Sequence, residues 1–478
     1  MQHNTHTSIL FSLLLLAAST VYADTDKYMT TEEDRVDLSV TAYNNNIALV
    51  RDRRMVQLPS GRQELAFMDV AQKINPVTVQ LRSHDTPVSI LEQNYEYDLM
   101  SPAKMLEKYI GKSVTLVNFD KNLGFQEVEA ELLSLNGGSI YRVGDKIHLN
   151  HPGSVVLPEI PANLIAKPSL IWLLDIAATD KPSHELEVSY ITGGIRWAAD
   201  YVLILDRNNN GFDLDGWVTL NNQSGTTYDN AKIKLVAGEV HRASKQHAYP
   251  EVAHMRAAAM ADAGGMHEEQ LADYHLYSLP ERTTLKENQS KQVRLLSRNG
   301  MPCEKVYELH SRNNVWYHRS AGGRNSDLHR ADVFLKFDNK QVNPGLEGAP
   351  LPAGVMRVYQ EDSEGMLQFI GEDRVDHTPE EETVRLKLGK AFDVVAETRQ
   401  TDFTKHGKNY YCSSYETKIR NHQDHDVVVQ VVESVGSNWQ ITKKSHEFIK
   451  RDAFTIVFPV TVPANGEAVL TYTIEVRN

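Results

Sequence analysis

The chain contains 478 residues, of which 63 are acidic and 50 basic, so its formal net charge at neutral pH is −13. This balance argues against a nucleic-acid binder, because phosphate contacts require a surplus of Lys and Arg. Two cysteines in a chain of this length exclude a disulfide-dense mini-domain. An apolar content of 41% beside 24% charged residues argues against global disorder. The length predicts about two to four domains with sizeable cores.

The first 23 residues have the features of a secretory signal peptide. Ile9 to Ala18 form an apolar run that is too short to cross a bilayer. Val21-Tyr22-Ala23 offers small residues at the positions that signal peptidase reads. The segment contains no Asp, Glu, Lys or Arg, so cleavage after Ala23 leaves the charge at −13. We expect a periplasmic or otherwise exported protein of the bacterial cell envelope, with no transmembrane helix in the mature chain.

Export would bring the two cysteines, Cys303 and Cys412, into an oxidising compartment where they could form a disulfide. A bridge that closes a loop of about 100 residues would stabilise the fold by up to ~4.7 kcal/mol in the chain-entropy description. The alternative is two buried free thiols that pack as small hydrophobic side chains. The pair is therefore a candidate disulfide.

Residues 24–100 are predicted to form an amino-terminal β domain. Val36 to Tyr43 alternates apolar and polar residues with a period of two, as a half-buried strand does. Residues 101–168 are predicted to form a small β-barrel. Ser101 can cap a short helix that has Pro102 at its first position, and five short strands then follow within about sixty residues, which is enough for a small closed barrel.

Residues 169–300 are predicted to form a β-rich central region, with a helical excursion near 251–266 where alanine and methionine are frequent. Residues 301–478 contain strands at the spacing that an immunoglobulin-like β-sandwich requires. Strands and helices do not alternate, which disfavours a doubly wound parallel sheet. We expect a mainly β, multi-domain protein with a carboxy-terminal sandwich, a small inserted barrel and few helices.

The segment from Asp206 to Gly211 follows the spacing of a calcium loop, with oxygen-bearing side chains at alternate positions and a glycine at the sixth. Trp217 stands at the twelfth position, where a bidentate Glu should complete the coordination shell. A polar hairpin turn between two strands explains the same residues. Asp206, Asn208 and Asn210 are therefore calcium candidates only, and we expect no bound metal or cofactor.

Two other polar patterns have simpler explanations. The segment 421–426 (NHQDHD) contains two histidines, but it lies where a polar turn between strands is expected. Paired carboxylates at 361–362, 372–373 and 380–382 would serve a glycosidase only if the fold placed two of them roughly 5 to 9.5 Å apart. Adjacent charges on strands and turns usually face water. The sequence therefore assigns no catalytic residue.

The aromatic residues divide into core residues and binding candidates. Placement on period-two strands predicts that Trp197, Tyr201 and Trp439 pack in the core. Trp316 and Tyr317 lie in the loop-like segment NNVWYHRS instead. Exposed aromatic side chains can form a platform for a sugar or a peptide, so these two are the candidates for contact with a partner.

Several strings together resemble the bacterial family catalogued as domain of unknown function 4139, which is related to the secreted mucoidy inhibitor A proteins. They are YITGGIRWAADYVLILD, DLDGWVTLNNQSGTTYDNAKIKLVAGEV, YHLYSLPERTTLKENQSKQVRLL, LPAGVMRVYQED, FIGEDRVDHTPEEETVRLKLGKAFDVV and GEAVLTYTIEVRN. The resemblance spans about residues 186–478. It implies an exported, mainly β protein without an established catalytic mechanism, and it transfers no functional residue. The long heptad-bearing middle section of the mucoidy inhibitor pattern is missing here.

These observations favour a non-enzymatic cell-envelope scaffold of unknown activity that binds a protein or glycan partner through its loops. The alternative is a hydrolase that acts on envelope polysaccharide or peptide with carboxylates drawn from distant strands. A concave cleft holding two acids with perturbed pKa values would favour the enzyme. Buried acids that are each paired with Arg or Lys would count against it.

Overall fold

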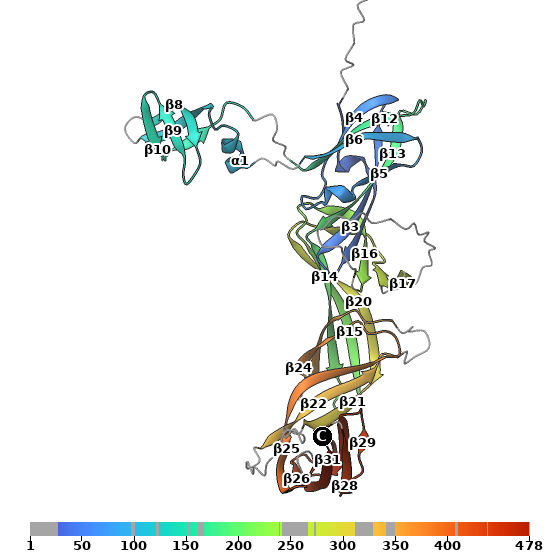
Figure 1. Cartoon of the computed structure of the whole chain (residues 1–478). Helices are drawn as coiled ribbons and strands as arrows, with labels where there is room; N and C mark the ends of the chain where they lie inside the picture. The colour runs from blue at the N-terminus through green and yellow to red at the C-terminus, as the bar shows by residue number, and fades with distance from the viewer. Residues whose placement is uncertain are drawn as a thin grey trace, which may run out of the picture. The chain divides into compact units, whose positions relative to one another are not determined.

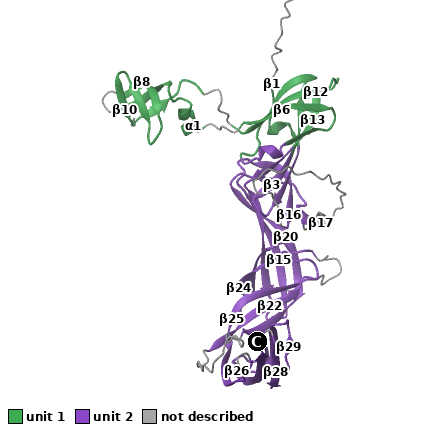
Figure 2. Ribbon diagram, in the orientation of Figure 1, with its two compact units in different colours: residues 1–36, 52–72, 80–188 green, residues 37–51, 73–79, 189–478 purple. Residues whose placement is uncertain are grey.

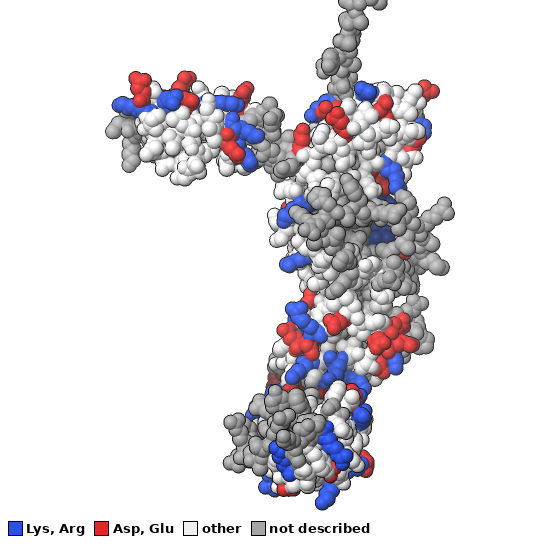
Figure 3. Space-filling view, in the orientation of Figure 1, with Lys and Arg blue, Asp and Glu red and all other residues white. Residues whose placement is uncertain are grey.

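The computed structural model describes residues 27–96, 101–120, 124–150, 153–160, 167–238, 240, 266–271, 274–310, 328–340, 349–406, 410–436 and 438–477. These residues form several β-sheets and a few short helical turns (Figure 1). The chain divides into two compact units (Figure 2). Unit 1 contains residues 1–36, 52–72 and 80–188, and unit 2 contains residues 37–51, 73–79 and 189–478. Charged side chains of both signs are interspersed on the face drawn in Figure 3.

Unit 1 contains a four-stranded sheet whose neighbouring strands are distant in sequence. Its spatial order is β1 (Lys27–Thr30), β4 (Gly61–Phe67), β12 (Ser169–Ile176) and β6 (Val88–Glu96). Trp172 on β12 is fully buried, and its ring centroid lies 5.9 Å from that of Phe67 on β4. A strand from beyond residue 168 therefore completes the sheet of the amino-terminal region, and residues 101–160 form an insertion in this sheet.

The insertion, residues 101–160, is a small lobe with its own core. It contains α1 (Pro102–Glu107) and an antiparallel sheet in the order β10 (Lys146–Leu149), β9 (Ile140–Val143), β8 (Gly124–Ser134), β7 (Ser113–Asp120) and β11 (Ser154–Val156). Leu106 and Tyr109 pack on one face of this sheet. The Tyr109 hydroxyl donates a hydrogen bond to the Glu159 carbonyl oxygen over 2.8 Å. This bond holds the Tyr109 ring in place over the core.

The prediction of a barrel at 101–168 is wrong, because the described sheet of the lobe is open. Its edges are β10 and β11, which contain only four and three residues. Residues around α1 fill the core face instead of further strands. The predicted helix start is confirmed: the Ser101 hydroxyl accepts a hydrogen bond from the Lys104 backbone N–H over 3.2 Å, with Pro102 in the first turn.

Two further sheets contain most of the strands between residues 35 and 375. The larger one has the order β17 (His267–Leu271), β18 (Tyr274–Ser278), β16 (Tyr228–Ala237), β2 (Arg35–Tyr43), β3 (Ile47–Gln57), β13 (Ser183–Gly193) and β5 (Gln80–Ser83), with β19 (Thr283–Leu285) paired to β16. The other has the order β20 (Gln289–Pro302), β15 (Gly211–Asn222), β14 (Ile195–Leu205), β23 (Gly354–Glu361) and β24 (Leu367–Val375). The pairs β16–β2 and β14–β23 are parallel.

The aromatic residues of β14 are core residues, as their spacing predicts. Trp197 is 3% exposed and Tyr201 is fully buried. The Tyr201 hydroxyl donates to the Pro352 carbonyl oxygen over 2.8 Å, so the polar end of the ring is satisfied inside the protein. This contact ties the start of the β23 segment to the middle of β14.

The carboxy-terminal part is a nine-stranded sheet that folds over on itself. Its order is β28 (Trp439–Lys444), β31 (Glu467–Arg477), β26 (Tyr410–Asn421), β25 (Thr383–Lys405), β22 (His329–Asp338), β21 (Glu304–His310), β27 (Val427–Ser434), β30 (Thr455–Val462) and β29 (Ile449–Lys450). The first half of β25 pairs with β22 and the second half with β26, so this one strand belongs to both layers.

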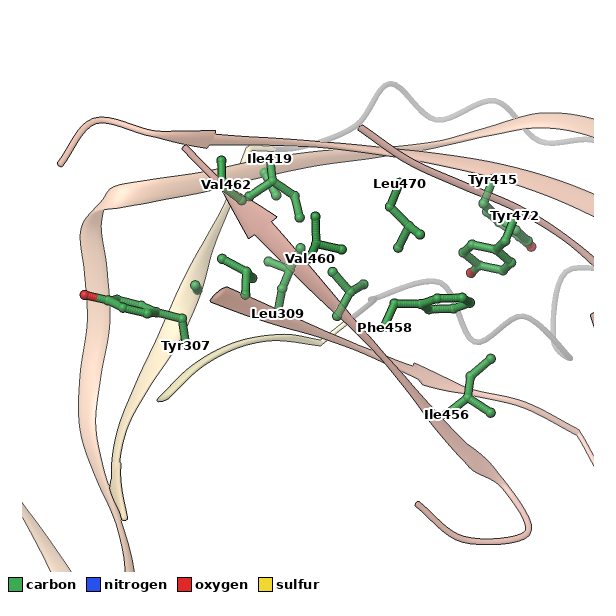
Figure 4. Packing of buried hydrophobic residues seen from close by; sticks show 14 of the residues in the cluster. Tyr307, Leu309, Tyr415, Ile419, Ile456, Phe458, Val460, Val462, Leu470 and Tyr472 are labelled. Carbon is green, nitrogen blue, oxygen red and sulfur yellow. The ribbon is translucent and has the colours of Figure 1, made fainter. Parts of the chain in front are cut away.

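A single hydrophobic core lies between the two layers of this sheet (Figure 4). The rings of Tyr415 and Phe458 stack on opposite sides of Tyr472, with ring centroids 5.4 and 5.2 Å from it. Leu309 and Val460 fill the space beside them. The mainly β, sandwich-like architecture expected from the sequence is therefore confirmed.

Some expectations concern residues that the structure does not describe. Residues 1–23, expected to be a signal peptide, lie outside the described residues, as do 251–265 of the expected helical excursion. Among the described residues, no helix is long and apolar enough to span a membrane.

Candidate functional site

A polar pocket of about 410 Å³ lies in unit 2, where three segments distant in sequence meet. The first segment is the turn Asn208–Asn210 between β14 and β15, and the second is the start of β21 from Cys303 to Tyr307. The third segment runs from His425 to Val428 at the start of β27, and Gln430 of the same strand also lines the pocket. The pocket thus brings together residues from the calcium candidate, one cysteine and the histidine-containing turn.

Main-chain and side-chain hydrogen bonds hold the first wall of the pocket. The Asp206 carboxylate accepts the Asn210 backbone N–H over 2.9 Å, and Asn209 adopts the left-handed conformation with φ 57°, which asparagine tolerates. Gln360 on β23 donates to the Asn209 side-chain oxygen over 3.1 Å. This is the polar hairpin turn that the sequence offered as the alternative to a calcium loop at Asp206, Asn208 and Asn210.

The histidine-containing turn, residues 421–426, forms the second wall. The Asn421 side chain is 1% exposed and donates to the carbonyl oxygens of His425, Val462 and Pro463 over 2.8, 3.3 and 3.1 Å. The Asp426 carboxylate accepts the Ala464 backbone N–H over 2.9 Å. A buried amide with three partners explains the shape of this turn without a metal. In the described part of the chain, no group of three or more His, Cys, Asp or Glu could hold a metal ion.

The floor between these walls is a parallel strand pair, β21 and β27. Tyr307 and Val429 face the hydrophobic core. Because side chains alternate along a strand, Glu308 and Gln430 face the opposite side of the sheet. Gln430 lines the pocket, and Glu308 is its register partner on the same face of the strand pair.

Glu308 is the centre of a charged cluster on this outer face. Its side chain is only 2% exposed, and it pairs with Arg385 over 2.7 Å, Arg451 over 3.0 Å and His310 over 3.1 Å. Arg451 also donates to Gln430 over 3.4 Å, which links the cluster to the pocket. Two guanidinium groups against one carboxylate leave an excess positive charge. We call Glu308, His310, Arg385 and Arg451 the Glu308 cluster.

The neighbouring strands β22 and β25 also carry more cationic than anionic side chains at this place. Asp332 on β22 is the register partner of Glu308. It forms ion pairs with Lys387 and Lys390, each at 3.2 Å. Burial opposes ionisation of Asp332, but the two lysines outweigh it and lower the pKa of that carboxyl. Figure 3 shows Lys and Arg side chains gathered over the region of β21 and β22. The outer face is therefore locally cationic on a chain whose net charge is −13.

The candidate disulfide is not formed: both Cys303 and Cys412 are free thiols. Cys303 follows β20 and lies at the pocket, where its thiol approaches the Asn209 carbonyl oxygen at 3.7 Å. Cys412 lies on β26, opposite Thr404 and Glu475. Burial and the nearby Asp206 raise the pKa of the Cys303 thiol to about 11, so it is a poor nucleophile.

The buried acids of the described residues have structural partners. Asp52 in unit 1 pairs with Arg35 over 3.1 Å and with the fully buried Arg54 over 2.8 Å. Asp69 pairs with Lys167. In the carboxy-terminal core, Glu433 lies beside Tyr472. Burial is the main reason that the pKa of the Tyr472 hydroxyl is raised, and the nearby Glu433 raises it further. Asp52, Asp69 and Glu308 thus pair with Arg or Lys, the arrangement that counts against a hydrolase with paired carboxylates, whereas Glu433 lies beside a tyrosine hydroxyl.

Neither the aromatic binding candidates nor the carboxylate runs are among the described residues that line the pocket. The partner-binding candidates Trp316 and Tyr317 lie outside the described residues. The carboxylate runs at 361–362, 372–373 and 380–382 lie at the surface, and none of their residues is buried. The sequence did not single out Glu308, although its alternation with Tyr307 and Leu309 in the strand EKVYELH places an acid on the face opposite two apolar side chains. Neither a protein-family model nor a curated protein matches this chain.

Proposed function

We propose that this protein is an exported cell-envelope β-scaffold that binds a glycan carrying anionic groups in the polar pocket. The observation that carries the proposal is the junction between a pocket lined by amide, hydroxyl and carboxylate side chains and the cationic Glu308 cluster. Its amides can exchange hydrogen bonds with sugar hydroxyls. The arginines beside them can attract carboxylate, sulfate or phosphate groups on the same chain.

The polar pocket and the Glu308 cluster would contact different groups of the ligand. The pocket itself contains Glu304, Asp426 and Lys305, so it has no surplus of positive charge. Arg385 and Arg451 keep 42% and 41% of their side chains exposed, so both can meet a ligand from solvent. Glu308 fixes the positions of both guanidinium groups in advance. A pre-positioned pair loses less conformational entropy on binding than two free side chains would.

Export and the family resemblance support a cell-envelope role. The apolar run at residues 9–18 is typical of a signal peptide. The strings across residues 186–478 resemble domain of unknown function 4139, and that family implies an exported, mainly β protein without an established catalytic mechanism. The ion pairs of the buried Asp52, Asp69 and Glu308 favour a binding protein over a hydrolase.

Isothermal titration calorimetry with an oligogalacturonate, a uronic acid oligomer, tests the proposal. We expect binding that weakens as salt is added, because part of the attraction is between charges, and much weaker binding of a neutral maltooligosaccharide. Arg385→Gln should raise the Kd at least about fivefold, since it removes one charge-assisted contact. Equal binding of the two oligosaccharides, or no binding of either, would contradict the proposal.

The matched control is Arg399→Gln. Arg399 lies on the same strand, β25, and pairs with Glu416 over the same 2.7 Å, and its side chain is 66% exposed. Its register partner belongs to β26 and not to β22. If Arg399→Gln weakened binding as much as Arg385→Gln, the attraction would come from overall charge and not from the Glu308 cluster.

A further inference from the structure

The lobe of residues 101–160 has a second face that its core does not use. Val114, Leu116, Ala130 and Leu132 point to the core face of the sheet. The residues between them on β7 and β8 therefore point to the opposite side, which we call the outer face of the lobe. The strand register places Phe119 opposite Phe125 on this face, and Ile147 on β10 opposite Arg142 on β9.

Large apolar side chains are exposed on this outer face. Phe119 is 60% exposed and Phe125 is 74% exposed, and their rings meet edge to face with centroids 5.2 Å apart. Ile147, Leu149 and Val156, which the register places on the same face, are 54%, 71% and 48% exposed. Soluble proteins rarely gather several such side chains on one flat surface unless something docks there.

An acidic row crosses the same face. Glu127, Glu129 and Glu131 alternate along β8, opposite Val117, Thr115 and Ser113 on β7. Glu127 and Glu129 are exposed, whereas Glu131 pairs with Arg142 over 2.9 Å. Three carboxylates against one guanidinium group leave the face negative. β8 is the central strand of the five, so the negative charge lies in the middle of the surface.

We propose that the outer face of the lobe docks a polypeptide segment that presents apolar and basic side chains together. The apolar side chains would cover Phe119 and Phe125, and the basic ones would pair with Glu127 and Glu129. Complementary charge of this kind selects the partner and speeds the encounter. The inference concerns a surface of unit 1 and does not depend on glycan binding in unit 2.

The charge of the face disfavours two other occupants. Anionic lipid headgroups would be repelled by the acidic row, although the exposed phenylalanines alone would suit a membrane surface. In a two-fold contact between copies, the central strand of one lobe would lie near that of the other, and the two acidic rows would repel each other. A basic, apolar segment has neither problem.

Fluorescence anisotropy of a short labelled peptide of alternating Lys and Leu, titrated with the full chain, tests the inference. We expect Phe119→Ser combined with Phe125→Ser to weaken binding at least about tenfold, because exposed aromatic anchors dominate such contacts. Glu127→Gln combined with Glu129→Gln should weaken binding and flatten its salt dependence. A peptide of alternating Glu and Leu should bind much more weakly than the Lys–Leu peptide.

Two control variants lie on the same lobe but off the outer face. Ile160→Ser removes an apolar side chain that is 60% exposed, and Asp145→Asn removes a carboxylate in the turn between β9 and β10. Both should bind the Lys–Leu peptide as the natural chain does. Equal binding of an alternating Lys–Ser peptide, or no effect of the phenylalanine pair, would overturn the inference. Phenylalanine-dependent binding to phosphatidylglycerol vesicles, without peptide binding, would assign the face to a membrane instead.

Discussion

Glu308 shows how a single residue acquires its role from strands far away in sequence. In the strand EKVYELH it is one of two acidic residues, and it pairs with arginines from β25 and from the segment after β29. The pairing makes a nearly buried carboxylate acceptable, because breaking it would leave a buried charge without compensation. The same pairing places two guanidinium groups beside the pocket.

Cys303 should be an unreactive thiol in the folded protein. Its pKa is raised from 9.0 to about 11, so near neutral pH its thiolate fraction is about a hundredfold below that of an unperturbed thiol. We expect alkylation by iodoacetamide to be slower by roughly that factor than in the urea-unfolded chain. Mass spectrometry of the peptide containing Cys303 measures this rate. Equal rates in the folded and unfolded chains would contradict the burial described here.

Asp37 should make the protein sensitive to acid. Burial opposes its ionisation, but Arg282 and Arg51 outweigh this effect and lower its pKa below 3.8. A lowered pKa means that the ion pairs stabilise the fold above the unfolded pKa and that this stability is lost as pH falls through the folded value. Asp37→Asn should therefore cost up to about 1 kcal/mol near neutral pH, since both arginines are partly exposed.

Urea denaturation of the natural chain and of Asp37→Asn, near neutral pH and below pH 3.8, checks this expectation. The difference between the two proteins should shrink as the pH falls below 3.8 and disappear once the pH lies below the folded pKa of Asp37. Asp180→Asn, which changes an exposed carboxylate, serves as the control and should match the natural chain at both. A difference that persisted unchanged in acid would show that Asp37 stabilises the fold by something other than its charge.

Single residues were predictable from the sequence where the local pattern decides their environment. Period-two spacing places Trp197 and Tyr201 in the core, and the structure confirms it. For Cys303 and Cys412 the compartment and the cysteine count left a disulfide and two free thiols as alternatives, and the structure has free thiols: Cys303 lies between β20 and β21, and Cys412 lies on β26. Arg385 and Arg451 had no local signal, because their partner is distant in sequence.

At the scale of elements, close backbone approaches decide which glycines are required. Gly194 precedes β14 with φ 86°, and a Cβ atom there would lie 2.4 Å from the Gln223 carbonyl oxygen. At its neighbour Gly193 an added Cβ would make only ordinary van der Waals contacts, because the nearest atom would be 3.8 Å away. The two adjacent glycines of the string ITGGIRW therefore have different reasons to be glycine.

Gly194→Ala and Gly193→Ala form a matched pair that tests this difference. Gly194→Ala should lower the free energy of unfolding of unit 2 by at least about 2 kcal/mol, because it combines an unfavourable φ with a backbone clash. Gly193→Ala should change it by less than about 0.5 kcal/mol. Guanidinium denaturation followed by circular dichroism measures both. Equal losses in the two variants would contradict the described path of the chain between β13 and β14.

Strands were predictable because alternation is local, whereas sheets were not. The period of two along Val36 to Tyr43 corresponds to β2, which spans Arg35–Tyr43. The lobe was predicted as a barrel because five short strands can close, but closure requires the two edge strands of the sheet to pair with each other. Here β10 and β11 remain the edges, since residues around α1 cover the core face.

The whole chain combines surfaces of opposite charge on a mainly β scaffold. Its net charge is −13, yet the outer face around Glu308 and Asp332 has a surplus of Arg and Lys. The outer face of the lobe is negative. Such a distribution suits a protein that engages ligands of different charge at different places.

Composition and spacing were sufficient to predict the class of fold but not the sites. The mainly β, sandwich-like architecture follows from alternating strands and turn residues, which are local properties. The pocket depends on three segments that meet only in the folded chain. Two of them, Asp206–Gly211 and 421–426, were interpreted from the sequence as polar turns, with calcium binding as the alternative for the first. The structure gives their side chains roles in polar turns that border the pocket.

Hydrogen exchange of the full chain with and without oligogalacturonate tests the central claim most directly, because it locates the ligand without a substitution. We expect slower exchange in Glu304–His310 of β21 and Val427–Ser434 of β27, with no change in residues 101–160. A maltooligosaccharide at the same concentration should leave exchange unchanged. If oligogalacturonate left β21 and β27 unprotected, or protected only other segments, the pocket beside the Glu308 cluster would not be its binding site.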